Sequence, residues 1–213
     1  MGSGRKIKQP SKYSGVMHDE FQPGSRNRVL RNKLGITTKR ELDDIEIEKY
    51  SDALLVLANK YEKEHRFTES DIKEIHNTIF QDIYDWAGKY RNVELSKEGF
   101  RFASAKYIKE LMRRYSERYL SQMTPPKTND KRKLAYNLAI LHNEFIIIHP
   151  FREGNGRTIR LLLYLIALQA GFDEFDFSTI DHKGKSYQRY IDAIYEGLGG
   201  NYIPMSEIIK ENL

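Results

Sequence analysis

A twelve-residue stretch, residues 149–160, gathers side chains of this sequence that could do phosphate chemistry. It reads His-Pro-Phe-Arg-Glu-Gly-Asn-Gly-Arg-Thr-Ile-Arg. An imidazole such as that of His149 ordinarily titrates near neutral pH and could take a proton from a hydroxyl group. Glu153 offers a carboxylate of the kind that holds Mg²⁺ against phosphate oxygens. A proton acceptor and a metal ligand therefore lie four residues apart.

The rest of this stretch could bind an anion. Gly154-Asn155-Gly156 can adopt positive φ angles and turn successive backbone N–H groups inward. A helix that starts at its end adds the positive end of its dipole. Arg157 and Arg160 are three residues apart, so we expect both guanidinium groups to project toward the same anion. A phosphate cradle, a metal carboxylate and a general base are the minimum set for phosphoryl or nucleotidyl transfer.

Each of these residues has a simpler explanation when it is taken alone. A Gly-Asn-Gly between helices often marks a tight connection, and a histidine near a helix end often caps it or packs. The argument for a site is that consecutive residues supply every component. A Walker loop is excluded, because the G-x-x-x-x-G-K-S/T spacing is missing. His142 and His149 could share a helix face as a metal pair, but no third ligand accompanies them; the remaining histidines, including His76, are predicted to be structural or at the surface.

Two strongly apolar helices are predicted on either side of the stretch. The first runs from about residue 131 to residue 148, since Pro150 forbids its continuation. The second begins near Asn155 or Arg157 and continues through an apolar run to Gly171. Helices that are apolar nearly all round belong at the centre of a bundle. We therefore expect the connection between them to be rigidly supported.

The remaining pattern is also mainly helical. Capping-box patterns at Thr38-x-x-Glu41 and Thr68-x-x-Asp71 predict helices that run to about Tyr61 and to Gly88. Loose alternation over residues 90–102, around Ser96-Lys97-Glu98-Gly99, predicts a short β-hairpin. Further helices are predicted from Ser104 to about residue 119, over 185–198 and over 204–212. The expected fold class is all-α, a helical bundle with one hairpin.

Composition restricts the broad class of protein. The chain has 213 residues, of which 39% are hydrophobic and 31% charged, and no cysteine, so disulfides and thiolate metal sites are excluded. No apolar run is long enough to span a bilayer and no signal peptide is apparent, so we expect a cytoplasmic protein without a membrane partner.

Charge is unevenly distributed along the chain. The net charge is +5, and residues 1–40 hold ten Lys or Arg against two acidic residues. We predict a basic, mostly irregular arm over residues 1–27 and one domain over 28–213. No recognition motif accompanies the basic residues, so nucleic acid is not an expected partner.

Residues 149–160 match, at every defined position, the signature H-P-F-x-D/E-G-N-G-R-x-x-R of the Fic (Fido) family. Residues 79–91 resemble the family's segment before its flap, and residues 30–36 resemble a segment found in many bacterial members. The resemblance covers about residues 28–210. It implies a Fic-type helical bundle of the toxin-like single-domain kind, with a flap at about 90–103 and a catalytic loop at 149–160.

The resemblance implies a protein adenylyltransferase, which moves AMP from ATP to a Tyr, Ser or Thr hydroxyl of a target protein with Mg²⁺ as cofactor. The roles that it implies are His149 as base, Phe151 as loop anchor, Glu153 as Mg²⁺ ligand, Gly154, Asn155 and Gly156 as phosphate holders through backbone and amide donors, Arg157 at the β-phosphate and Arg160 at the γ-phosphate. The target would add a strand along the flap. The relative Doc, a phosphotransferase, has Lys where this sequence has Gly156, which favours AMP transfer.

Two alternatives remain open at this point: a Fic-fold phosphotransferase and a non-catalytic peptide-binding module. The inhibitory pattern S/T-x-x-x-E-G/N of many Fic proteins is missing, since Glu196-Gly197 has Asp192 where Ser or Thr is required. We expect a separate antitoxin to supply the inhibitory glutamate, or else a regulatory segment outside this sequence. An alternative to the cytoplasm of the producing cell is a host cell into which the protein is delivered. Tyr187, Tyr190 and Tyr195 are candidates for a place near the nucleotide.

Overall fold

The structure, a computed structural model, describes residues 20–97, 99–176 and 185–213. Its elements confirm the predicted all-α fold class with one small hairpin. They are, in chain order, α1 (Lys39–Lys60), α2 (Glu69–Phe80), β1 (Ser96–Lys97), β2 (Phe100–Arg101), the 3₁₀ turn η2 (Ala105–Tyr107), α3 (Ile108–Tyr115), the π-helical segment η3 (Ser116–Leu120), α4 (Ser121–Met123), α5 (Lys131–Ile148), α6 (Asn155–Gln169), α7 (Lys185–Leu198) and α8 (Ile203–Asn212).

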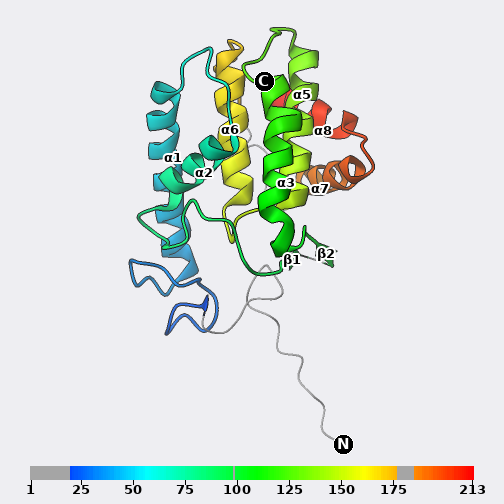
Figure 1. Cartoon of the computed structure of the whole chain (residues 1–213). Helices are drawn as coiled ribbons and strands as arrows, with labels where there is room; N and C mark the ends of the chain where they lie inside the picture. The colour runs from blue at the N-terminus through cyan, green and yellow to red at the C-terminus, as the bar shows by residue number, and fades with distance from the viewer. Residues whose placement is uncertain (1–19, 98, 177–184) are drawn as a thin grey trace, which may run out of the picture.

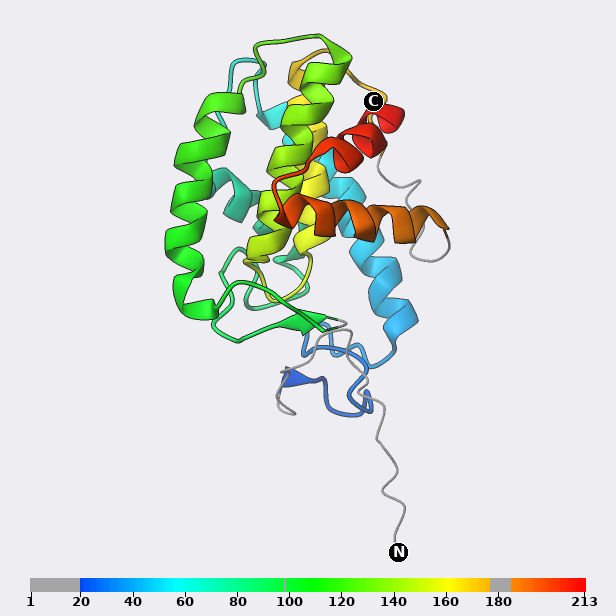
Figure 2. The same cartoon turned by 90° about the vertical axis from the view of Figure 1, so that its right-hand side faces the viewer.

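Helices α5 and α6 lie at the centre of the bundle, as their apolar sequences predict. α6 packs between α2 and α5, while α8 packs along α5. Figures 1 and 2 show α1 and α2 on one side of α6, with α5, α7 and α8 on the other. Both central helices bury most of their side chains, including Leu138, Leu141, Leu162 and Leu163, which are fully buried. Their long apolar surfaces therefore find partners on several sides.

Several predicted boundaries agree with the structure, and two local predictions are wrong. α2 ends at Phe80 instead of continuing to Gly88. Ile83 and Tyr84 both donate their backbone N–H to the Phe80 carbonyl, which forms tight turns and lets both side chains enter the core. The capping box at Thr68 forms, whereas Thr38 accepts no backbone hydrogen bond on its side chain.

The β-hairpin is shorter than its sequence pattern predicts. β1 and β2 pair antiparallel over only two residues each, with Ser96 opposite Arg101 and Lys97 opposite Phe100. Outside this ladder, the side chain of Arg91 donates to the carbonyls of Val93 and Ala103. The Arg91 side chain thus joins the segments that precede and follow the hairpin.

The N-terminal segment of the described chain packs at the same end of the bundle. Residues 20–37, the hairpin and the connection between α5 and α6 lie together at the lower end in Figures 1 and 2. Glu20 accepts from Nε and Nη2 of Arg152, at 2.9 and 2.6 Å. Folded structure therefore begins by residue 20, inside the predicted arm; residues 1–19 lie outside the described part, and the domain boundaries stay a prediction.

None of the helices within the described ranges combines the length and the apolar character needed to cross a membrane.

Candidate active site

The connection between α5 and α6 is a buried loop with a left-handed residue at each end. His149 ends α5 with φ 51° and ψ 59°, and Gly154 precedes α6 with φ 79° and ψ 4°. Between them, Phe151, Arg152 and Glu153 are all less than a tenth exposed. The chain thus reverses sharply at the base of the two central helices, and their packing holds the loop in place.

His149 is oriented by contacts on its ring edge and its ring face. Its Nδ1 lies 3.2 Å from the carbonyl oxygen of Ile146, and its ring stacks on Phe102 with centroids 3.8 Å apart. Because a carbonyl oxygen only accepts, Nδ1 carries the hydrogen of this bond. The neutral imidazole then has its acceptor lone pair on Nε2. This is the tautomer that a general base needs.

Phe151 is fully buried beneath the loop, where it stacks on His76 with centroids 3.8 Å apart and an interplanar angle of 20°. His76 also accepts on Nδ1 from the backbone N–H of Gly88 at 2.9 Å. Its Nε2 therefore donates to the carbonyl of Glu153, 3.1 Å away. One neutral imidazole connects α2, the Gly88 turn and the loop. Sequence reasoning classed His76 only as structural or at the surface, although a histidine among Ile72, Ile75 and Ile79 on one helix face signals a buried polar partner.

Burial lowers the pKa of His76 to about 3 and that of His142 to about 4. An imidazole in the unfolded chain titrates near 6.5, so below that pH the unfolded state binds more protons than the folded state. We expect the free energy of unfolding to hold steady above about pH 7 and to fall as the pH drops from 6.5 toward 4. Each histidine should contribute roughly 1–2 kcal/mol to the loss at pH 5.

Urea unfolding at pH 7 and at pH 5 measures this dependence. His76→Gln should be less stable at pH 7, since it loses the stacked ring, but should lose less stability on acidification than the wild type. An equal loss in both proteins would contradict the assignment to His76.

Glu153 lies at the N-terminus of α6. Its Oε1 accepts from the backbone N–H of Gly154 at 2.9 Å and is 3.7 Å from Nη2 of Arg157. A carboxylate is favoured at this end of the helix dipole. Gly154 itself has no room for a side chain, because a Cβ there would lie far inside van der Waals contact with the Phe80 ring.

We therefore expect Gly154→Ala to lower the free energy of unfolding by roughly 2–5 kcal/mol, since left-handed strain costs about 1–2 kcal/mol and overpacking about 1–3 kcal/mol. Gly171→Ala is the matched control, because Gly171 has φ 87° and a Cβ at that position would meet nothing within 4 Å. It should show the strain alone, about 1–2 kcal/mol. Chemical denaturation of both variants checks this, and equal losses would argue against the Phe80 contact.

Asn155 braces the loop from within. Its Oδ1 accepts from the N–H of Phe151 and its Nδ2 donates to the Phe151 carbonyl, both at 2.8 Å. The amide is thus engaged inside the loop, not directed at a phosphate as expected. Gly154 alone of the three central residues has a positive φ, because Asn155 and Gly156 already belong to α6. The backbone N–H groups of this first helical turn have no acceptor within the helix and remain available to an anion.

The two arginines of the stretch have different partners, and that both bind one anion stays a prediction. Arg157 donates from Nη1 to Glu46 of α1 at 2.7 Å and lies over the Phe80 ring, 4.7 Å from its centroid. Arg160 turns back along α6: a Cβ at Gly156 would come within 3.2 Å of its Nη1. The two side chains differ because the buried carboxylate of Glu46 binds the Arg157 guanidinium.

Arg160 makes no ion pair or hydrogen bond to any residue of the described ranges. Burial raises the pKa of Tyr190 to about 12, and the positive charge of Arg160 acts against this rise. The same charge also opposes the burial that raises the pKa of Tyr50 on α1, and it adds to the burial that lowers the pKa of His142 on α5. Arg160 therefore presents a positive charge to the space near the α6 N-terminus, between α1 and α7.

Arg91 ties the hairpin to the loop. Besides Val93 and Ala103, its guanidinium donates to the carbonyls of His149 at 2.8 Å and Ile148 at 3.4 Å. Its backbone N–H donates to Pro150 at 2.9 Å. Sequence reasoning placed Arg91 where the segment before the flap meets the start of the flap, without a role of its own. In the structure it fixes the spacing between flap and proposed base.

The hairpin also contacts α7. Lys97 donates to the Tyr187 hydroxyl at 2.9 Å, and Phe100 meets Tyr195 edge to face at 5.9 Å. Two of the three tyrosines singled out from the sequence thus contact the flap, while Tyr190 is hydrogen-bonded to His142.

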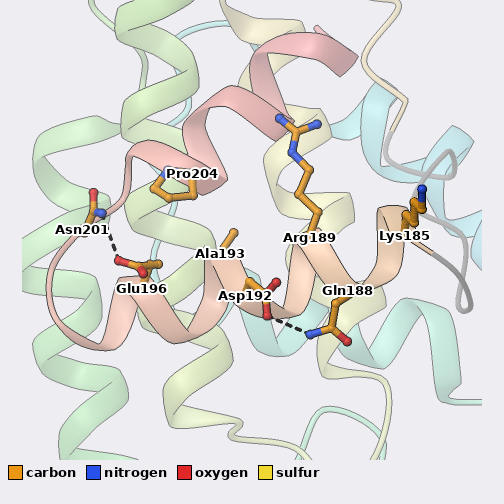
Figure 3. Close-up of a pocket in the computed structure, with 8 residues that line it drawn as sticks. All are labelled: Lys185, Gln188, Arg189, Asp192, Ala193, Glu196, Asn201 and Pro204. Atoms are coloured by element: carbon orange, nitrogen blue, oxygen red, sulfur yellow. Dashed lines mark hydrogen bonds between the residues drawn. The ribbon is translucent and has the colours of Figure 1, made fainter.

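An open pocket of about 520 Å³ lies elsewhere, between α7 and α8 (Figure 3). Five of its polar side chains already have partners: Gln188 pairs with Asp192, Asn201 with Glu196, and Arg189 with Glu211, which does not line the pocket. No residue of the 149–160 stretch lines it. We therefore do not place the nucleotide there.

Comparison with known proteins agrees with this geometry. Residues 66–167 match the model of the Fic/DOC family. The chain is 28% identical over 199 residues to the probable protein adenylyltransferase y4lH of Sinorhizobium fredii, covering 93% of this chain and 97% of that protein. It is also 28% identical over 190 residues to the protein adenylyltransferase VbhT of Bartonella schoenbuchensis, covering 87% of this chain but only 37% of VbhT.

Two solved structures share the fold. The N-terminal Fic domain of a VirB-translocated Bep effector from Bartonella quintana superposes with a TM-score of 0.73 at 22% identity, over 92% of this chain and 91% of that one. BepC from Bartonella tribocorum, with bound AMPPNP, gives 0.69 at 23% identity, over 86% and 91%. The signature loop, the helical bundle and these matches together identify residues 66–167 as a Fic/DOC domain.

Proposed function

We propose that this protein is a protein adenylyltransferase that transfers AMP from ATP to a Tyr, Ser or Thr hydroxyl of a target protein and releases pyrophosphate. The observation that carries the proposal is His149 in the Nδ1–H tautomer, at the opposite end of a rigid loop from the N-terminus of α6. The loop thus supplies a proton acceptor and an anion-binding helix end together. The names of the relatives y4lH and VbhT support the same reaction.

In this proposal, the triphosphate lies at the α6 N-terminus. The backbone N–H groups of Asn155 and Gly156 in the first turn hold phosphate oxygens, with Gly154 providing the left-handed bend before them, and Arg160 binds the γ-phosphate. The target hydroxyl oxygen attacks the α-phosphorus while Nε2 of His149 takes its proton. The bond from the α-phosphorus to the oxygen bridging toward the β-phosphate breaks, and pyrophosphate leaves. The product is a phosphodiester between AMP and the target side chain.

The residues present fit a magnesium ion shared with the nucleotide. The described residues contain no cluster of three or more His, Cys, Asp or Glu side chains that could hold a metal alone. Mg²⁺ is commonly bound by one or two carboxylates together with substrate phosphates and water. Glu153, next to the phosphate-binding helix end, supplies such a carboxylate. The ion would neutralise charge on the α- and β-phosphates.

The flap is the proposed docking edge for the target. Phe102 stacks on His149, so a strand that adds to the hairpin would pass beside the proposed base. We further propose that a separate antitoxin supplies the inhibitory glutamate, for which Arg160 is the natural ion-pair partner. The site of action is the cytoplasm, either of the producing cell or of a host cell that receives the protein.

The test is to incubate the protein with Mg²⁺, bacterial lysate and ATP labelled at either the α- or the γ-phosphate. Label retained on protein only from α-labelled ATP is the expected result. Label retained from γ-labelled ATP would identify a phosphotransferase instead. No retention from either, in protein shown to bind ATP and freed of any co-purified inhibitor, would favour a non-catalytic binding module.

A further inference from the structure

Glu46 lies on α1, outside residues 66–167 that match the family model, yet it binds Arg157 of the 149–160 stretch directly. We propose that Glu46 is a positioning residue of the AMP-transfer site: it holds Arg157 so that this guanidinium supports the Glu153 carboxylate as a metal ligand. This inference rests on the part of the proposed function in which Glu153 binds Mg²⁺ beside ATP.

Glu46 is itself held by contacts to both of its carboxylate oxygens. The residue is 6% exposed, in a core region where a lone carboxylate would be costly. Its Oε1 accepts from the Tyr84 hydroxyl and its Oε2 from Nη1 of Arg157, each at 2.7 Å. Tyr84 is in turn stacked on Trp86 with centroids 4.2 Å apart. Glu46 therefore has a fixed orientation.

Arg157 bridges two carboxylates. Its Nη1 binds Glu46, while its Nη2 is 3.7 Å from Oε1 of Glu153. Its guanidinium lies over the Phe80 ring, the same ring that packs on Gly154. An arginine side chain stays charged in proteins, and these contacts hold its guanidinium in place.

Arg157 could serve the site in two ways. If it swung out to a phosphate, Glu46 would be left buried with only a tyrosine hydroxyl as partner, which is unfavourable. If it acts where it is, it orients Glu153 and balances part of its charge. Outer-shell partners of this kind commonly change metal affinity 10- to 100-fold when they are removed. The second role fits the contacts, and it moves Arg157 from the β-phosphate contact that the family resemblance implies to the support of Glu153.

The test measures ATP binding by calorimetry over a series of Mg²⁺ concentrations, with thermal unfolding of each protein alongside. Glu46→Gln keeps the shape but removes the charge, and should raise the Mg²⁺ concentration needed for half-maximal tightening of ATP binding by about tenfold. ATP binding without Mg²⁺ should change little. Tyr84→Phe should shift the Mg²⁺ requirement in the same direction by less. Glu48→Gln, on the exposed face of the same helix, is the matched control and should behave as the wild type.

An unchanged Mg²⁺ requirement in folded Glu46→Gln would overturn the inference, as would wild-type ATP binding that is insensitive to Mg²⁺. Tighter ATP binding at every Mg²⁺ concentration would also overturn it, since Glu46 would then withhold Arg157 from the phosphates. If Glu46→Gln does not fold, Tyr84→Phe tests the inference instead, because it keeps the charges of Glu46 and Arg157. The measurement is again the Mg²⁺ concentration needed for half-maximal tightening of ATP binding. A wild type that binds Mg²⁺ and ATP but transfers no AMP would defeat the proposed function alone and leave this comparison valid.

Discussion

His149→Ala is expected to lower the rate of AMP transfer by about 10²- to 10⁴-fold, the usual contribution of a positioned general base. ATP binding should be largely intact, because the proposed phosphate contacts come from the α6 N-terminus and Arg160, not from the imidazole. The rate is measured as label transferred from α-labelled ATP, and binding by calorimetry. A variant that modifies its target at the wild-type rate would show that another group accepts the proton.

Two further variants separate the chemical role of His149 from its structural role. The residue has φ 51°, so alanine adds left-handed strain as well as removing the base. His149→Asn tolerates this backbone conformation better and should be equally inactive. His65→Ala removes a histidine at the other end of α1, away from the loop, and should retain full activity. Loss of activity in His149→Ala but not in His149→Asn would point to the backbone instead of the base.

Arg91→Met is expected to lower the free energy of unfolding by about 3 kcal/mol or more. The substitution removes a buried charged donor and leaves several backbone carbonyls without their partner, and a hydrogen bond to a charged group contributes about 1.5–3 kcal/mol. Arg91→Lys should rescue little, because a point charge cannot span carbonyls on the flap and the loop at once. Chemical denaturation measures the stability of each variant.

The matched control for Arg91 is Arg101→Met, which changes an exposed arginine on β2 of the same hairpin. It should lie within about 0.5 kcal/mol of the wild type. Amide hydrogen exchange should rise in residues 93–104 of Arg91→Met only, because the flap loses its connection to the loop. Equal stability of the Arg91 and Arg101 variants would contradict the role assigned to Arg91.

The sequence by itself determined the helices that carry the site and the stretch in which the site lies. α5 and α8 match their predicted bounds to within one residue, and α7 ends at Leu198 as predicted, because periodic apolar side chains and Pro150 or Pro204 act locally. The turn of the hairpin was predicted at the correct residues, but its strands were predicted to be longer than they are. α2 was predicted too long, since apolar spacing alone does not distinguish a helix from the tight turns that follow Phe80.

Only the tertiary structure decided what each polar side chain of the site does. Arg157 binds Glu46 across 111 residues, His76 binds the Glu153 carbonyl across 77, and Arg91 binds the His149 carbonyl across 58. A buried polar group must find a partner, so a sequence can indicate that one exists. Which group it is depends on where packing brings distant segments together. For that reason the local spacing of Arg157 and Arg160 predicted a shared anion but could not predict that Arg157 pairs with Glu46 of α1.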